Sequence, residues 1–200
     1  GLKHTAALPL LLAAYELGEQ DFSKVVQLIG RFAFRYKNVC NGNIAQPQRV
    51  YYQHAWAIRN GAFSFDALQT ALQEKIDLQA SDDVFKVALN KALAYKPRAQ
   101  NGNVKFFFSA INDYWVGLNG VPGAALRPRK DVVADWTQID IEHIYPETPD
   151  PIEYGAGDGQ MHDRRHNFEN LTLWWYPDNR ALKNASFGTK KDSLNAEGQP

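Results

Sequence analysis

The stretch DIEHIYP, residues 140–146, decides how the second half of the chain folds. Ile139 and Ile141 alternate with Asp140 and Glu142, and Pro146 ends the run, a pattern typical of a short, half-buried β-strand that ends at the proline. A strand that only filled a core would have little use for Glu142 and His143 side by side. The stretch therefore predicts a strand within residues 137–145 that also carries a functional site.

A second strand is predicted in NLTLWW, residues 170–175, after a loop rich in Gly, Asp and Pro. Pro177 is a favourable first helical residue, so DNRALKN, residues 178–184, is expected to form a short helix. The predicted order is strand, long loop, strand, helix. Within it, Asn170 begins the second strand and Asn179 falls in the helix.

Residues 1–120 are predicted to form a helical bundle, because apolar residues recur there at helical spacing and the loops are short. Asp21 and Ser64 are the expected N-caps of two helices, and Asn41-Gly42 is expected to end one of them. Residues 121–135 contain two prolines and a basic run and are predicted to be a linker. Residues 136–200 would form a strand–strand–helix unit packed on the bundle, so the fold class is mainly α.

The composition, with 44% hydrophobic and 22% charged residues, indicates a soluble globular chain. The most apolar run, residues 6–17, is shorter than the roughly 20 residues that a membrane span needs, so no membrane association is expected. A single cysteine, Cys40, excludes an internal disulfide and fits an intracellular compartment. The net charge is zero, so contacts with nucleic acid must come from local clusters. The chain begins with Gly1, which suggests a piece of a longer protein.

His143, taken alone, has a plain structural interpretation as a buried, hydrogen-bonded histidine. Three features favour a functional role instead. The histidine lies just before Pro146, where the backbone bends, an acid precedes it directly, and Asn170 and Asn179 follow at suggestive places.

DIEHIYP, NLTLWW and DNRALKN together resemble the HNH nuclease motif, which is built on a ββα-metal hairpin. More narrowly, the chain resembles the C-terminal nuclease domain of modification-dependent restriction enzymes of the GmrSD type, a group that includes phosphorothioate-sensing defence nucleases. In that family an EHI-P strand is followed by GNLTLL and by a helix with the pattern N-x-x-L-x-N-x-x-F-x-x-K. The chain matches the helix pattern at Asn179, Leu182, Asn184, Phe187 and Lys190. It departs from the family at Glu169, where glycine is common.

The resemblance implies a metal-dependent DNA endonuclease or nickase of bacterial anti-phage defence. His143 would be the general base, since an imidazole titrates near neutrality. Asn170 would hydrogen-bond across the hairpin and hold His143 in place. Glu142 and Asn179 would bind one Mg²⁺ or Mn²⁺ ion, because oxygen ligands suit these cations.

The expected substrate is double-stranded DNA. Phosphate contacts are expected from a set of basic residues, for each of which a solvated surface role is the alternative: Lys190, Lys183, Arg180 and Arg165, with Arg164 and His166 as further candidates. The resemblance also implies a full-length protein of the bacterial cytoplasm, with an N-terminal nucleotide-hydrolysing domain that senses modified DNA. The alternative is a non-catalytic DNA-binding or regulatory helical module with a decayed hairpin. The sequence leaves open which modification is sensed, whether one or both strands are cut, and the oligomeric state.

Overall fold

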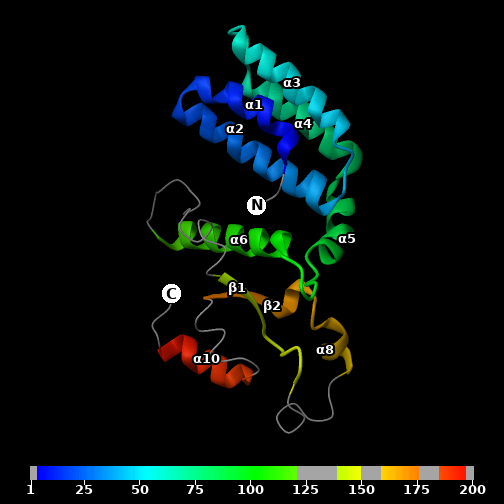
Figure 1. The fold of residues 1–200 in the computed structure, drawn as a ribbon, viewed down its shortest axis with the longest axis vertical. Coiled ribbons are helices and arrows are strands. Elements are labelled where there is room, and N and C mark those ends of the chain that lie inside the picture. Colours follow the sequence, from blue (N-terminus) through cyan, green and yellow to red (C-terminus); the bar gives the residue numbers. More distant parts are fainter. Residues whose placement is uncertain (1–3, 121–138, 150–158, 176–184, 197–200) are drawn as a thin grey trace. The chain divides into compact units, whose positions relative to one another are not determined.

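The computed structural model describes residues 4–120, 139–149, 159–175 and 185–196 (Figure 1). The chain divides into two compact units, residues 1–92 and 93–200. Helices dominate the described residues, and the sheet found among them has two strands. The predicted mainly α fold with a small hairpin unit is therefore confirmed.

The first unit is a bundle of helices (Figure 1). Its α-helices are α1 (Leu8–Ala14), α2 (Glu19–Phe32), α3 (Ala45–Arg59), α4 (Phe65–Gln79) and α5 (Asp82–Ala92). Helix α1 packs on α2 and α3, and α4 packs on the same two helices. The apolar faces meet in one core that includes Leu10, Phe32, Tyr51, Leu68 and Leu72, all of them buried.

The helix ends in this unit follow local chemistry. Ser64 caps α4 as predicted, because its hydroxyl accepts a hydrogen bond from the Ala67 N–H at 3.2 Å. The prediction that Asp21 is an N-cap was wrong. Gly18, with φ at 86°, lets α2 begin at Glu19, so Asp21 lies in the first turn. The predicted stop at Asn41-Gly42 is confirmed, although the chain before it, Ala33–Val39, is π-helical.

The second unit contains α6 (Gly102–Gly120), β1 (Ile139–His143), α8 (Gly159–Arg164), β2 (Leu171–Trp175) and α10 (Phe187–Ala196). Strands β1 and β2 pair antiparallel (Figure 1), and the Lys105 ammonium of α6 donates a hydrogen bond to the Ile139 carbonyl at 2.6 Å. Helix α6, expected in the bundle, thus belongs to the unit that holds the hairpin. The predicted ranges 1–120, 121–135 and 136–200 stay predictions, since the linker lies outside the described residues.

Helix α8 is a difference from the sequence analysis, which expected only a loop between the two strands. The residues of α8 after Gly159 include good helix formers. The glycine-rich segment before the helix is typical of a loop, so the composition of the region did not predict a helix there. The predicted helix at residues 178–184 lies outside the described residues. Among the helices that are described, none is both long and apolar enough to span a bilayer.

Candidate active site

The two strands of the hairpin pair along their whole length, so each residue of β1 lies opposite one residue of β2. Ile139 lies opposite Trp175 and His143 opposite Leu171, so Glu142 faces Thr172. β-Branched and aromatic residues occur in both strands, Ile139 and Ile141 in β1 and Thr172 and Trp174 in β2, as suits a pleated, half-buried surface. Successive side chains of a strand point to opposite faces. Glu142 and His143 are therefore directed to two different surroundings, although both are buried.

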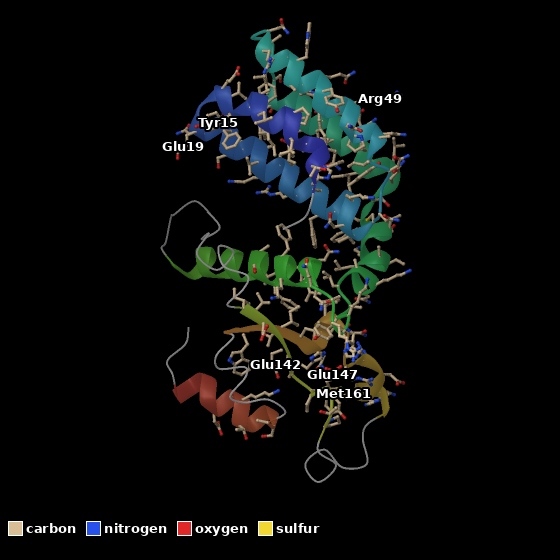
Figure 2. All side chains as sticks on the ribbon, viewed as in Figure 1. Tyr15, Glu19, Arg49, Glu142, Glu147 and Met161 are labelled. Atoms are coloured by element: carbon tan, nitrogen blue, oxygen red, sulfur yellow. The ribbon has the colours of Figure 1, made fainter. Side chains whose placement is uncertain are left out.

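The carboxylate of Glu142, on one face of β1 (Figure 2), is held by a lysine from α10. The Lys190 ammonium donates a hydrogen bond to Glu142 Oε1, and it lies 3.3 Å from the His143 main-chain oxygen. Only 3% of the lysine side chain and 11% of the glutamate side chain are exposed. Burying either charge alone would cost several kcal/mol, so each is tolerated because the other compensates it.

The residues at the start of α10 position Lys190 beside Glu142. Ser186 precedes α10, and its hydroxyl accepts the Thr189 N–H at 3.0 Å while its carbonyl accepts the Lys190 N–H at 3.0 Å. These bonds satisfy donors of the first helical turn. The cap therefore fixes where α10 begins and directs Lys190 toward β1.

The imidazole of His143 lies on the other face and meets a second histidine. Its Nε2 atom is 3.2 Å from Nδ1 of His166. The Tyr95 ring stands edge-on to His143, with centroids 4.7 Å apart, and stacks on His166 at 5.6 Å and 26°. The Tyr95 N–H also donates to the His166 carbonyl at 2.8 Å. Two rings, those of Tyr95 and His166, thus lie against the His143 imidazole.

This environment keeps His143 neutral. Burial, followed by the neighbouring His166, lowers the pKa of His143 to about 4. Glu147 acts in the opposite direction, and Lys190 and Arg165 lower the pKa further. At neutral pH the ring therefore carries a lone pair. No described residue hydrogen-bonds to the second ring nitrogen, Nδ1.

Asn170 connects the segment that follows β1 to the start of β2 through hydrogen bonds to the main chain. Its amide oxygen accepts the Tyr145 N–H at 2.7 Å, and its amide nitrogen donates to the carbonyls of Tyr145 and Arg165, each at 2.9 Å. Its main-chain carbonyl accepts the Ile144 N–H at 2.9 Å. Asn170 thereby ties the segment that follows His143 to the start of β2 and to the residue before His166.

The remaining candidates of the sequence analysis fall into two groups. Asn179, Arg180 and Lys183 lie outside the described residues. Arg165 is partly buried and donates to the His162 carbonyl at 2.9 Å. Arg164, the last residue of α8, pairs with Glu169, and both side chains of this ion pair are exposed.

Sequence reasoning missed the surroundings of His143. The sequence predicts no role for Tyr95 and predicts His166 only as a phosphate contact, whereas the rings of both lie against His143. A histidine in the loop between two motif-bearing strands was the one available signal for His166. Tyr95 lies far upstream in a segment with no motif, and only the folded chain brings it to the hairpin.

The described residues contribute oxygen donors that fit a divalent cation. Glu142 Oε1 and the His143 carbonyl both contact the one ammonium of Lys190, so two oxygens converge on a position that already attracts positive charge. Oxygen donors suit Mg²⁺. Within the described parts of the chain, no three His, Cys, Asp or Glu side chains gather into a metal site. Glu142 is the acidic ligand that these parts would supply.

The fold and the site define a small antiparallel hairpin with a neutral histidine at the end of one strand and an asparagine at the head of the other. A family model described as "GmrSD restriction endonucleases, C-terminal domain" matches residues 63–198. The match covers more than half of the chain, so the chain belongs to this family, a family of restriction endonuclease domains that act on DNA. No curated protein matches the chain.

Proposed function

We propose that the hairpin is the active site of an HNH-type DNA endonuclease or nickase that hydrolyses phosphodiester bonds with His143 as general base. The observation that carries this proposal is the state of His143. It is neutral and buried at the end of a strand, with Nε2 engaged by His166 and Nδ1 without a hydrogen bond from the described residues. A neutral imidazole with a lone pair can take a proton from an attacking water.

His143 would remove this proton while the water oxygen attacks the phosphorus atom. The bond from phosphorus to the leaving sugar oxygen breaks, and that oxygen takes a proton from solvent water. Asn170 does not touch the imidazole but fixes the backbone on both sides of it, through Tyr145 and Arg165. We therefore assign Asn170 a positioning role. A displaced histidine would be a poor base even with its chemistry intact, because proton transfer needs hydrogen-bond reach.

Glu142 and Asn179 would hold one Mg²⁺ or Mn²⁺ ion, with Glu142 as the acidic ligand. Such an ion neutralises charge on the phosphate and on the leaving oxygen. The Lys190 ammonium already compensates this carboxylate inside the protein, so a metal ion would have to displace it from Glu142. Lys190 would have to leave Glu142 to reach a phosphate, so its phosphate contact and its ion pair are alternative states of one side chain.

Phosphate contacts from Arg165, and from Arg180 and Lys183, would hold the DNA on this unit. The chain has no net charge to attract DNA as a whole, so binding depends on these local cations and weakens with salt. The family membership supports a role in bacterial anti-phage restriction, in the cytoplasm. It also supports a full-length protein with an N-terminal nucleotide-hydrolysing domain that senses modified DNA.

The test is cleavage of a supercoiled plasmid in Mg²⁺ or Mn²⁺, scored for open-circular and linear product. His143→Ala should bind DNA normally and cut about a hundredfold or more slowly. His162→Ala is the matched control, because His162 is an exposed histidine of the same unit. Cutting by His143→Ala at the wild-type rate would contradict the proposal. DNA binding with no cutting by any form would favour a non-catalytic DNA-binding module.

A further inference from the structure

Helices α3 and α4 of the first unit border a surface cavity of about 380 Å³ that the proposed nuclease chemistry does not use. Ligand sites in proteins have volumes of roughly 300–1,000 Å³, so the cavity is large enough for a phosphate group with its attached sugar. It lies wholly within the first unit. Its walls come from Ala45, Gln46, Arg49, Val50 and Gln53 of α3 and from Lys75 of α4.

The cavity is lined by two cations and by no carboxylate. Arg49, which Figure 2 labels, is exposed, and Lys75 is partly buried. Residues three and four positions apart on a helix are neighbours. Around Arg49 and Lys75 these positions hold only uncharged residues, which are Ala45, Gln46, Tyr52 and Gln53 on α3 and Ala71, Leu72, Leu78 and Gln79 on α4. Among the described residues, neither cationic side chain forms an ion pair or a hydrogen bond.

The carboxylates of α4 lie on another side of this helix. Asp66, Glu74 and Asp77 line a separate cavity, and none of them lines the cavity of Arg49 and Lys75. Two like charges beside one space repel each other, and an anion that binds between them removes this repulsion. The charges are therefore arranged as in a site for an anion.

Two side-chain amides add hydrogen-bond donors to the cavity. Gln46 and Gln53 lie three positions before and four positions after Arg49, so all three share one face of α3. The amides of both glutamines are without a hydrogen bond from the described residues. Each can therefore donate to the oxygen of a ligand.

The chemistry of the lining selects a phosphate group of a nucleic-acid backbone. A guanidinium presents its N–H donors in a planar fork that fits phosphate, and an ammonium adds a point charge. None of the lining residues is aromatic, so the cavity offers no ring on which a base could stack. The lining thus fits a backbone phosphate, whatever the base sequence, better than a free nucleotide.

We propose that the cavity between α3 and α4 binds a DNA backbone phosphate through Arg49 and Lys75, with Gln46 and Gln53 as further donors. The preference for phosphate follows from the lining, whereas the choice of DNA rests on the proposed nuclease function. Helix α3 lies outside residues 63–198, which the family model matches, so family membership does not imply this site. The helical unit would hold DNA in addition to the phosphate contacts proposed for the second unit.

Fluorescence anisotropy of a labelled DNA duplex, in EDTA and over a series of salt concentrations, tests the site without cleavage. For the Arg49→Gln/Lys75→Gln chain we expect a dissociation constant about 10-fold higher. The logarithm of its binding constant should fall with the logarithm of salt concentration by a slope about 1 smaller, since one phosphate contact is lost. Arg59→Gln/Lys91→Gln is the matched control, because it removes the same charge from exposed positions of the first unit that do not line the cavity, and its effect should be clearly smaller.

Nitrogen-15 NMR of the wild-type chain locates the contact. The signals of the Gln46 and Gln53 side-chain amides and of the Arg49 Nε–H group are followed during titration with the DNA duplex and, separately, with inorganic phosphate. We expect these signals to shift near the dissociation constant of the duplex, and with inorganic phosphate only at much higher concentration. A shift with inorganic phosphate and none with DNA would overturn the proposal.

The outcomes separate this site from the active site. Weaker DNA binding by the Arg49→Gln/Lys75→Gln chain, in a protein that never cuts DNA, would defeat the proposed function and leave the phosphate site standing. The same dissociation constant and salt slope in this chain and in the control would overturn the phosphate site and leave the nuclease intact. Should the double variant fail to fold, Arg49→Gln alone and the wild-type NMR titration still decide the matter, because Arg49 is exposed.

Discussion

Substitution of Asn170 by alanine tests the positioning of His143 most directly. The side chain is 9% exposed and makes three hydrogen bonds, of 2.7, 2.9 and 2.9 Å, to the main chain of Tyr145 and Arg165. Each contributes about 0.5–1.5 kcal/mol net, so Asn170→Ala should lower the free energy of unfolding by roughly 2–4 kcal/mol. For a chain of this size the melting temperature would fall by roughly 5–15 °C.

The assay combines thermal unfolding with single-turnover cleavage well below the melting temperature. Cleavage should slow while DNA affinity is kept, since the bonds lost hold the backbone around His143. Asn170→Asp separates the bonds, because it retains an acceptor for the Tyr145 N–H but loses the two donated bonds. It also brings a negative charge close to two carbonyls, and should therefore be no more stable than Asn170→Ala.

Asn60→Ala is the matched control. Asn60 also donates its side-chain amide to a main-chain carbonyl, that of Trp56 at 2.7 Å, but at an exposed helix end. Solvent replaces a bond lost there, so the change in unfolding free energy should stay below about 1 kcal/mol. An unchanged melting temperature for Asn170→Ala would refute the reasoning from buried bonds. A stable but inactive Asn170→Ala would show that Asn170 takes part in the reaction directly.

Three further predictions follow from the site and the bundle. EDTA should abolish plasmid cleavage and Mg²⁺ or Mn²⁺ restore it; undiminished cutting in the chelator would remove the metal assignment. Lys190→Met should cost about 3–5 kcal/mol in a urea titration by leaving the Glu142 carboxylate buried without its ammonium, and Glu142→Gln in the same chain should recover part of this loss. Burial, and then Lys37, lowers the pKa of His4 below its usual 6.5, so the unfolded chain binds this proton more readily. The contribution of His4 is therefore complete above about pH 6.5 and is lost as the pH falls from there through the folded pKa. His4→Gln should accordingly lose less stability than the wild type between about pH 7 and pH 5 in pH-dependent thermal melts.

The strands could be located from the sequence because their signal is local. Alternating isoleucines before Pro146 placed the first strand within residues 137–145, and β1 occupies Ile139–His143. The second was placed at 170–175, and β2 is Leu171–Trp175. Each boundary depends on neighbouring residues alone, so alternation in the first strand and a short, mostly apolar run in the second were enough to locate both.

The surroundings of the candidate site could not be predicted in the same way. Lys190 lies 48 positions from Glu142, and His166 lies 23 positions from His143, with other elements between them in both cases. A local sequence pattern cannot predict that these residues lie close together in space, because their contacts depend on how α10 and the segment after α8 pack on the hairpin. Lys190 matches the family's helix pattern, which indicated that this residue matters. The pattern did not indicate the ion pair that Lys190 forms with Glu142 in the folded chain.

Glu142 and His143 are neighbours on one strand, but their side chains lie in different surroundings. This separation matters for the chemistry of the site. A cation next to an imidazole lowers its basicity, so a metal ligand and a general base interfere when they share one surface. Strand alternation directs Glu142 and its positive partner Lys190 away from the His143 ring. Lys190 accordingly lowers the pKa of His143 less than burial and His166 do, although its ammonium contacts the His143 carbonyl. Burial and the neighbouring His166 thus have the largest effects on the pKa of His143, and the ammonium of Lys190 has a smaller one. Variants of Lys190 should therefore affect stability more than the basicity of His143, whereas variants of His166 should mainly affect that basicity.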